Sequence, residues 1–467
     1  MELPIIRQGG MGIDISIPSL GNKVSRLGGY GTVSGVVAGT VLARRLQLGD
    51  IGGHYRRALA HFPFPEIAEQ VLEAYFVAGG ILPCAQFKPV PMFTLNPSNL
   101  LIALTVCANF CLVWLAKEGH GGPIAINFLE KVQLSLIYGL VGAMLAGVDE
   151  VTAGAGIPIQ IPGILDAIAA GRNPAYEVDA TIADKKGTVR IEFDLIKFFR
   201  KHLPKMKRPG FIPIIGTHVL AEYLASKCSS TIEGFVVELP PAGGHVVRPR
   251  GIIRYDDFGE PIYDPIRDMP NWGRMVNLMR KLGLPWWVGG DCASPEKLAW
   301  AKSIGATGVQ VGGIMASSRE SGERDDLRRR KNRLAYRNEL LVKTDMSASP
   351  TGFPFKLTNL TDRDQLALRT PKCTHGALVE VCIDEKGHDF YRCPAEPIKD
   401  YLRKGGNIEK TKGVVSLCNG LFGNSQIGGP GEIPTQTYSS KFAFIRELLT
   451  DENGDYGVED AMNYLLS

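Results

Sequence analysis

A histidine preceded by two glycines is the residue in this chain best suited to acid–base chemistry. His245 ends the segment Pro-Ala-Gly-Gly-His at residues 241–245, which follows the apolar run 234–238. Glycine lets the backbone approach a ligand closely, and histidine exchanges a proton near neutral pH. A Gly-Gly-His turn also occurs in ordinary loops, so its neighbours decide whether it forms a site.

Glycines close several other apolar runs in the same way. They are Gly9, Gly10 and the adjoining Met11, Gly154 and Gly156, Gly289, Gly290 and the adjoining Asp291, and Gly312 and Gly313. In a barrel such residues meet at the face where active sites lie, and the loops after strands seven and eight commonly bind phosphate there. The sequence has neither a P-loop nor a Gly-x-Gly-x-x-Gly segment between a strand and a helix, which disfavours nucleoside triphosphates and a Rossmann domain. The glycines therefore predict a cradle for a phosphate-bearing cofactor with a planar ring.

Eight short apolar runs supply the strands that would position these residues. They cover residues 4–8, 30–34, 123–127, 150–153, 211–216, 234–238, 286–289 and 308–312. Helical patterns lie between them, at residues 135–146, 162–170, 218–228, 275–281 and 294–304. Near-continuous apolar strands are typical of a parallel sheet that is buried on both faces. The chain is therefore expected to form an α/β fold, a (β/α)8 TIM barrel.

The expected barrel spans residues 1–323 and carries two insertions. Residues 35–122 form a helical insertion after the second strand, and residues 172–210 contain an alternation typical of a surface hairpin. Residues 324–467 are expected to form an α-rich C-terminal extension that packs on the barrel. This extension begins with a charged helix whose basic run, 328–331, is expected to face solvent.

The composition indicates a globular protein whose partner is a small molecule. The 467 residues include 21% charged residues and have a net charge of +4, which argues against nucleic acid or a membrane surface as partner. The nine cysteines are scattered, and the N-terminus lacks the features of a secretion signal. The apolar stretch 100–116 is too short to span a bilayer and is expected to form a buried helix. We expect a cytoplasmic protein with reduced thiols.

The glycine-rich segments resemble the nitronate monooxygenases, formerly called 2-nitropropane dioxygenases. Similar segments lie at residues 4–12, 28–34, 126–131, 154–158, 242–245, 308–312 and 349–354, and the tail that carries cysteines resembles a longer subgroup. The resemblance implies a TIM barrel that binds flavin mononucleotide (FMN). It also extends to the related flavin-dependent enoyl-carrier-protein reductases.

The resemblance implies a cofactor site built largely from glycine backbone. Gly9, Gly10 and Met11 would lie against the isoalloxazine ring, Asn127 would lie at the polar edge of the flavin, and Lys131 would lie near the charge of the reduced flavin. The phosphate would be held by Gly289, Gly290, Gly312 and Gly313. The remaining cofactor-binding candidates are Gly154, Gly156, Gly243, Gly244 and Asp291. His245 stands at the position of the family's catalytic histidine, as general acid or base. Taken singly, Asn127 could cap a turn, Lys131 could be a surface charge and Met11 could fill the core.

Two further candidate catalytic residues have competing interpretations. Glu238 ends the sixth strand and either supports catalysis or pairs with Arg248 or Arg250. His218 faces the barrel mouth in the comparison with the longer subgroup, whereas the preceding Thr217 would suit a helix cap.

Four cysteines of the tail are spaced unlike the ligands of a typical metal site. Cys373, Cys382, Cys393 and Cys418 are separated by 8, 10 and 24 residues, without a Cys-x-x-Cys pair. We expect buried thiols and no metal.

Three functions from different classes fit the resemblance. The first is oxidation of alkyl nitronates or nitroalkanes with O2, without an added nicotinamide. The second is NAD(P)H-dependent reduction of an enoyl thioester, with an acyl thioester or acyl carrier protein as partner and His245 as proton donor. The third is a non-catalytic flavin-binding partner protein, against which the presence of His245 argues. An inosine-monophosphate-dehydrogenase-like barrel is disfavoured because the loop after the sixth strand has no nucleophilic cysteine. The sequence does not decide whether the protein forms a homo-oligomer.

Overall fold

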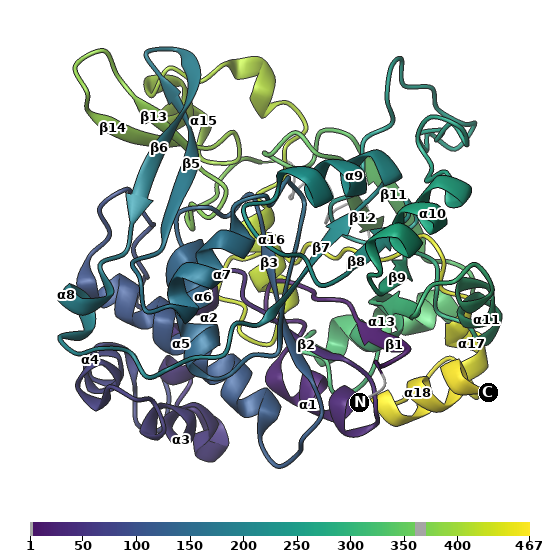
Figure 1. Cartoon of the computed structure of the whole chain (residues 1–467), viewed down its shortest axis with the longest axis horizontal. Helices are drawn as coiled ribbons and strands as arrows, with labels where there is room; N and C mark the ends of the chain where they lie inside the picture. Colours follow the sequence, from purple (N-terminus) through teal and green to yellow (C-terminus); the bar gives the residue numbers. More distant parts are fainter. Residues whose placement is uncertain (1–2, 360–369) are drawn as a thin grey trace.

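Among the residues that the structure describes, eight parallel strands form a closed barrel (Figure 1). The computed structural model describes residues 3–359 and 370–467. The barrel strands are β1 (Ile6–Gln8), β2 (Gly31–Ser34), β3 (Ile124–Leu129), β4 (Glu150–Gly154), β7 (Gly210–Ile215), β8 (Phe235–Glu238), β9 (Trp286–Gly289) and β10 (Gly308–Val311). Their order is β1-β10-β9-β8-β7-β4-β3-β2, and a parallel bridge between Arg7 and Tyr30 closes β1 onto β2. The expected (β/α)8 barrel is confirmed, with all eight strands at the expected places.

Helices connect the strands and cover the outside of the barrel (Figure 1). They are α1 (Pro18–Arg26), α6 (Leu136–Leu145), α7 (Ile161–Ala169), α9 (His218–Lys227), α10 (Trp272–Leu282), α11 (Pro295–Ser303) and α12 (Gly313–Ala316). Helix α11 begins where Ser294 accepts a hydrogen bond from the backbone N–H of Lys297 and proline fills the first helical position. Thr217 caps α9 in the same way, through the N–H of Leu220. The helices expected after β3, β4, β7, β8 and β9 are confirmed.

The insertion after β2 is helical, as expected. It contains α2 (Ala38–Gln47), the 3-10 helix η1 (Ile51–Gly53), α3 (His54–Ala60), α4 (Pro65–Tyr75) and α5 (Asn99–Lys117). Helix α5 is the one described helix whose length and apolar composition would allow it to cross a membrane, but 83% of its apolar window is buried inside the protein. It is apolar on all sides because α1, α2, α3, α4 and α6 pack around it. The expected buried helix is confirmed.

The second insertion forms a hairpin that the C-terminal extension completes. Strands β5 (Ala175–Ile182) and β6 (Lys185–Glu192) pair in antiparallel fashion, followed by the short helix α8 (Leu195–Phe199). The free edge of β5 takes up β13 (Glu380–Ile383), which in turn pairs with β14 (Asp389–Arg392). The resulting four-stranded sheet lies at the upper left in Figure 1. The expected hairpin is confirmed, and its edge is covered because backbone groups there need partners.

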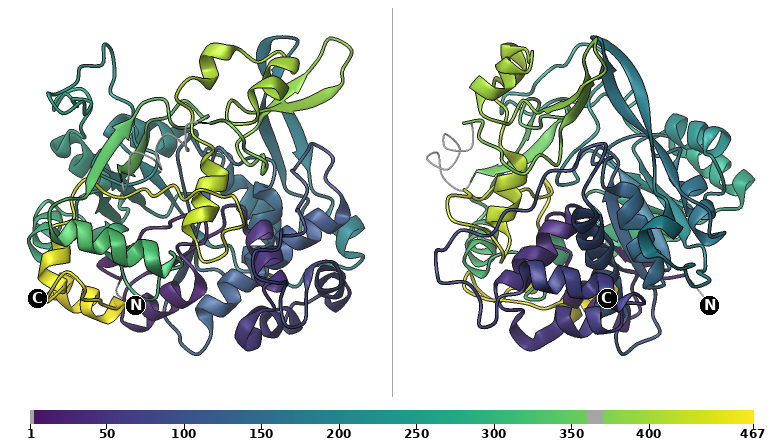
Figure 2. Two further views of the ribbon diagram at one scale, coloured as in Figure 1. Left: turned by 180° about the vertical axis from the view of Figure 1, so that it is seen from behind. Right: turned by 90° about the vertical axis from the view of Figure 1, so that its left-hand side faces the viewer.

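The C-terminal extension is rich in helices, as expected, and also contains short strands. Its other elements are α13 (Asp325–Tyr336), β11 (Leu341–Asp345), β12 (Phe355–Asn359), α15 (Ile398–Arg403), η2 (Ile408–Thr411), α16 (Leu417–Asn424), α17 (Phe444–Leu448) and α18 (Val458–Leu466). Strands β11 and β12 pair with each other, whereas β13 depends on the distant β5. Short strands such as these form because a partner strand is available, and their sequences show little alternation of apolar and polar residues. Helix α18 packs on α1, which brings the two ends of the chain to the same region (Figure 2).

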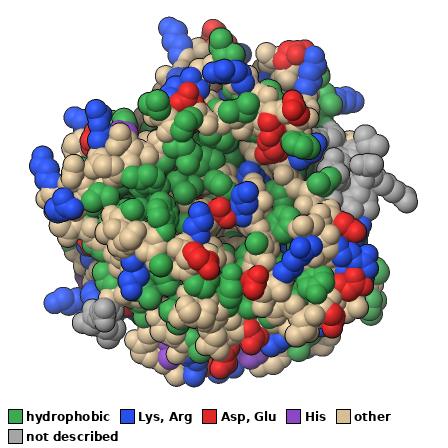
Figure 3. All heavy atoms as spheres, turned by 90° about the vertical axis from the view of Figure 1, so that its right-hand side faces the viewer, with side chains coloured by type: hydrophobic (Ala, Val, Ile, Leu, Met, Phe, Trp, Pro, Cys, Tyr) green, Lys and Arg blue, Asp and Glu red, His purple; other side chains and the backbone are tan. Residues whose placement is uncertain are grey.

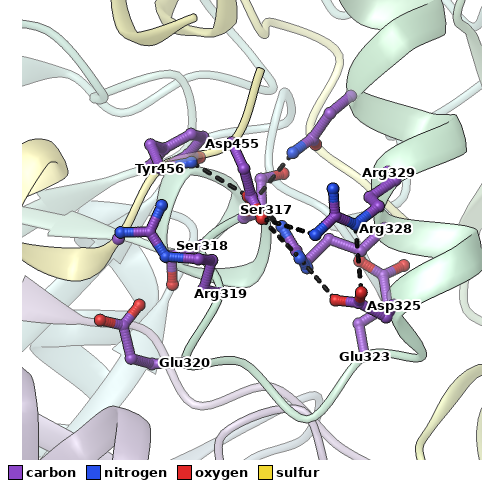
Figure 4. Close-up of polar contacts among 12 residues, drawn as sticks. Ser317, Ser318, Arg319, Glu320, Glu323, Asp325, Arg328, Arg329, Asp455 and Tyr456 are labelled. Carbon is purple, nitrogen blue, oxygen red and sulfur yellow. Dashed lines mark hydrogen bonds and ion pairs between the residues drawn. The ribbon is translucent and has the colours of Figure 1, made fainter. Parts of the chain in front are cut away.

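The basic run at the start of the extension is buried in part, so the expectation of a solvated face is wrong. The side chain of Arg328 is 2% exposed and forms ion pairs with Asp455 and Asp325 (Figure 4). Its guanidinium also donates to the carbonyl oxygen of Ser317. The side chain of Lys331 is equally buried and pairs with Glu323. Arginine and lysine occupy these positions because carboxylates from residues distant in sequence pair with them, which a local charge pattern cannot show.

A buried ion pair lies inside the barrel at the level of its N-terminal half. Arg7 of β1 is fully buried, pairs with Glu150 of β4, and stacks on the rings of Tyr30 and Trp287 at 4.4 and 4.5 Å. The indole N–H of Trp287 donates to the carbonyl oxygen of Pro4 at 2.9 Å. The barrel interior is therefore packed, and open space is left toward its other end.

Several large apolar side chains stay exposed in the long segment after β8. Ile252, Phe258 and Ile266 are 88%, 80% and 90% exposed. The segment projects at the upper right in Figure 1, on the side of the molecule that Figure 3 shows. Apolar side chains gather on this face with charged side chains around them (Figure 3). Exposed apolar clusters are typical of contact surfaces.

Candidate active site

A cavity of about 270 Å³ lies at the carboxyl ends of the barrel strands. Its wall includes most of the residues expected to bind a cofactor or act in catalysis. These are Gly9, Gly10, Met11, Asn127, Gly154, Glu238, Gly243, Gly244, His245, Gly289, Gly290, Asp291, Gly312 and Gly313. The carboxyl ends of parallel strands carry the active sites of TIM barrels, so this cavity is the candidate active site.

Three glycines of the wall are not required by the packing of the protein itself. A Cβ atom added at Gly9, Gly289 or Gly312 would meet no protein atom closer than 3.6 Å. None of the three has a positive φ angle. The volume that each Cβ would fill belongs to the cavity, which is what a bound planar group against the backbone requires. The glycines therefore fit a flat ligand held against β1, β9 and β10.

Other glycines of the wall are required by the protein. A Cβ at Gly10 would lie 2.1 Å from the Cβ of Asn127, and Gly290 has a φ of +82° with the carbonyl oxygen of Leu239 only 2.6 Å away. A Cβ at Gly243 would lie 2.9 Å from the backbone of Tyr438. At these positions the fold of the protein itself requires glycine, with or without a ligand in the cavity.

Asn127 presents a hydrogen-bond donor to the cavity. Its Oδ1 accepts a hydrogen bond from Oγ1 of Thr152 at 2.8 Å, which orients the amide. Its Nδ2 donates to none of the described residues, and the side chain lines the cavity. A polar edge of a ligand can accept this bond.

His245 reaches the cavity from the loop after β8 and is held by the C-terminal extension. Its Nε2 forms a hydrogen bond of 2.7 Å with Oγ of Ser349, which in turn bonds Oγ1 of Thr351 at 2.7 Å. The ring of Phe355 meets the imidazole edge to face at 4.9 Å. Burial lowers the pKa of His245 to about 4, so the imidazole is neutral at neutral pH. It can accept or donate a hydrogen bond there, but it is a weak base.

Glu238 is a carboxyl group of the cavity wall that titrates near neutral pH. It ends β8, and burial raises the pKa of its carboxyl to about 7. Its backbone pairs with β9, but in the described part of the chain its carboxyl group has no hydrogen-bond or ion-pair partner. Arg250 pairs instead with Asp268, at 3.5 Å. A carboxyl that is partly protonated at pH 7 can serve as a general acid.

The end of the cavity beside β9 and β10 gathers the features expected of a phosphate site. The N-terminus of the short helix α12 begins at Gly313. Ser439 places its Oγ beside Gly313, and Lys441 also lines the cavity. Asp291, with a φ of +60°, pairs with Lys297 at 3.9 Å, and burial raises the pKa of its carboxyl. Backbone N–H groups, a hydroxyl and a lysine are suited to phosphate oxygens.

The extension supplies cavity residues that the sequence did not single out. Glu323 and Lys331 form a buried pair in the wall, and the ammonium of Lys331 lies 4.5 Å from the ring centre of Tyr438. Ser439 and Lys441 follow Tyr438 in the chain. The one local signal is the Ser-Ser-Lys segment between Tyr438 and Phe442, and such a segment does not distinguish a site from a loop.

Three of the residues expected at the site lie outside this cavity wall. Lys131 pairs with Glu130 at 3.4 Å and lines a smaller cavity of about 70 Å³. Gly156 packs against Glu130, and a Cβ there would lie 1.8 Å from its carboxylate. His218 begins α9, where its Nδ1 accepts from the N–H of Asn271 at 3.4 Å. None of these three residues belongs to the wall of the cavity.

The cysteines do not form a metal centre in the part of the chain that the structure describes. No group of three or more His, Cys, Asp or Glu residues there has the arrangement needed to hold a metal ion. All nine cysteines are free.

Comparison with known proteins supports the fold. No family model matches the chain, and no curated protein matches it. Among solved structures, FabK from Thermotoga maritima superimposes with a TM-score of 0.50 at 12% identity and covers 99% of this chain and 91% of its own. Nitroalkane oxidase from Streptomyces ansochromogenes (TM-score 0.39, 13% identity, 77% of each chain) is also similar. A third is the enoyl reductase domain of MlnA from Bacillus amyloliquefaciens (TM-score 0.38, 11% identity, 76% of this chain and 63% of its own).

Proposed function

We propose that this protein binds FMN in the cavity and is a flavin-dependent oxidoreductase. The observation that carries the proposal is the set of glycines at Gly9, Gly289 and Gly312, whose missing side chains leave space that the protein does not fill. The ring would lie against this backbone, Asn127 would donate to its polar edge, and the phosphate would lie by Gly313, Ser439 and Lys441. FabK, a flavin enoyl-carrier-protein reductase, shares the fold over nearly the whole chain.

We infer that the reaction is oxidation of an alkyl nitronate with O2. Bound FMN would supply the two-electron chemistry. The chain's own part is to orient the substrate and to exclude water. A His245 that is neutral and weakly basic is poorly suited to remove a proton from a nitroalkane, but it can donate a hydrogen bond to a nitronate that arrives as the anion. Ser349 fixes the orientation of the imidazole.

One observation favours a second function, reduction of an enoyl thioester with NAD(P)H. That reaction needs a proton donor for the carbon beside the thioester, and Glu238 carries a proton near pH 7 in the cavity wall. The acyl group would be carried by coenzyme A or by an acyl carrier protein. In this function Glu238 is the acid and His245 binds the thioester oxygen.

An anaerobic mixing experiment tests both functions. The protein is reconstituted with FMN, freed of excess cofactor, and mixed separately with propyl-2-nitronate, NADH and NADPH while the visible flavin spectrum is recorded. Bleaching by the nitronate alone supports nitronate oxidation, whereas rapid bleaching by a nicotinamide supports the reductase. A protein that retains no FMN after reconstitution contradicts the proposal as a whole.

Two variants separate the roles of the side chains. In a nitronate oxidase Glu238→Gln should leave the rate with nitronate nearly unchanged, and His245→Ala should lower it. In a reductase Glu238→Gln should lower turnover of an enoyl thioester by about 100-fold or more, the usual contribution of a general acid. Equal effects of both variants on both reactions would show that neither role is correct.

A further inference from the structure

Three cysteines of the C-terminal extension lie together beside the cavity. Cys373, Cys393 and Cys418 are buried in one cluster with Ala395 and Val414. They come from three separate segments, and Cys418 belongs to the first turn of α16. Cys382 on β13 is also buried but does not belong to this cluster. The four cysteines that look alike in the sequence are therefore of two kinds.

Two hydrogen bonds from backbone N–H groups to side chains align the segment of Cys373 with the start of α16. The N–H of Lys372 donates to Oγ of Ser416 at 2.9 Å, and the N–H of Thr374 donates to Oδ1 of Asn419 at 3.2 Å. These two bonds flank Cys373 on one side and Cys418 on the other. The two thiols are thus held close together in one buried cluster.

The surroundings of Cys373 stabilise a thiolate. The neighbouring Cys418 and the backbone of Gly376 and His375 lower the pKa of the Cys373 thiol, whereas the neighbouring Cys373 and burial raise the pKa of the Cys418 thiol. A thiolate next to a protonated thiol is the arrangement of a nucleophilic cysteine and its resolving partner.

The pair is connected to the candidate active site. Cys418 lines the cavity together with Leu417 and Leu421 of α16 and with Ala377 and Leu378 of the adjoining loop. A small oxidant in the cavity would therefore meet Cys418 directly, and Cys373, which is 7% exposed, lies in the same cluster. Within the described ranges no third side chain completes a metal-binding group with these thiols.

We propose that Cys373 and Cys418 form a redox-active dithiol that hydrogen peroxide converts to a disulfide. The thiolate of Cys373 attacks one oxygen of the peroxide, the O–O bond breaks, and hydroxide leaves and takes up a proton as water. The sulfur of Cys418 then attacks the sulfenic acid on Cys373, the S–O bond breaks, the S–S bond forms, and a second water leaves. The two thiols lose two electrons and two protons, and the peroxide is reduced to two waters.

The disulfide would tie the loop after Cys373 to α16 in the cavity wall. It would link residues that are 45 positions apart in the chain, next to the hydrogen bond that already joins Lys372 to Ser416. The proposal does not require FMN in the cavity, so its outcome is independent of the proposed function.

A thiol count tests the proposal directly. Fully reduced protein is treated with a slight excess of hydrogen peroxide, unfolded, and titrated with a thiol reagent. The nine thiols of the chain should fall to seven, and dithiothreitol should restore nine. Peptide mass spectrometry of the alkylated protein should find one disulfide, between Cys373 and Cys418.

Matched variants sharpen the test. Cys382→Ser removes a buried thiol whose pKa burial raises to about 11, and this variant should still lose two thiols to peroxide. Cys418→Ser should form no disulfide and should instead leave a sulfenic acid on Cys373 that dimedone traps. If Cys418→Ser does not fold, the peptide map of the wild type still decides.

Three results would overturn the proposal. The first is a peroxide-treated wild type that keeps nine thiols. The second is a disulfide that joins either residue to Cys393 and not to its proposed partner. The third is a metal ion that the purified protein retains and that Cys373→Ser loses, because the thiols would then be ligands.

Discussion

Substitution of the glycines of the cavity wall can show which of them are required for FMN binding and which are required for the stability of the protein. Gly312 has φ −112° and ψ −63°, which an alanine adopts without strain, and an added Cβ would lie 3.6 Å from Sδ of Met11. Gly312→Ala should therefore leave the free energy of unfolding of the flavin-free protein unchanged or raise it by about 0.4–1 kcal/mol. FMN held against this backbone would meet the new methyl group within contact distance.

The expected loss of FMN affinity follows from the size of such an overlap. Extra methyl groups in a filled site cost about 1–3 kcal/mol, which corresponds to a roughly 5- to 150-fold higher Kd. Flavin fluorescence titration measures the Kd, and urea unfolding of the flavin-free protein measures stability. The result should be a variant that is as stable as the wild type and binds FMN poorly.

Gly290→Ala is the matched control. The φ of +82° at Gly290 and the carbonyl oxygen of Leu239 at 2.6 Å make any side chain costly there, so this variant should lose about 1–3 kcal/mol of stability without any ligand. If Gly312→Ala binds FMN as the wild type does, or is destabilised as Gly290→Ala is, the inference of a flavin against this backbone is refuted.

Two further predictions concern buried charges. The pKa of Glu238 is about 7 in the folded protein, above its ordinary value of 4.5, so its contribution to stability is fully present below pH 4.5 and is lost as pH rises through 7. Urea unfolding should accordingly show that Glu238→Gln gains stability relative to the wild type between pH 5 and pH 8, and an unchanged difference would contradict the raised pKa. Glu150→Ala should lower the free energy of unfolding by about 3–5 kcal/mol because it leaves the fully buried Arg7 unpaired. Glu459→Ala, which removes an exposed partner of Lys23, should change it by less than about 1 kcal/mol, and similar losses in both variants would mean that the buried pair has no special role.

The barrel could be derived from the sequence because its signals are local. Each strand is a short apolar run that is buried on both faces, and the helices between them carry their own caps, as Ser294 and Thr217 show. The arrangement of the strands around a TIM barrel then follows from their order in the chain. Residues at the strand ends, such as Gly289 and Gly312, consequently came to one face without any knowledge of long-range contacts.

The extension could not be derived in this way. Its strand β13 exists because β5 offers an edge about 200 residues earlier in the chain, and its basic helix is buried because Asp455 and Glu323 meet Arg328 and Lys331. A run of four basic residues looks solvated unless those partners are known.

The sequence by itself determined the barrel, the glycines at its carboxyl end and the histidine after the sixth strand, because each depends on neighbouring residues only. The tertiary structure alone decided which groups surround the histidine and which thiols meet. Ser349 reaches His245 from 104 positions away, and Cys418 lies in one cluster with Cys373 because hydrogen bonds join the segments around them. Burial then set the proton affinities of Glu238 and His245, and burial is a property of the folded chain and not of its residue types.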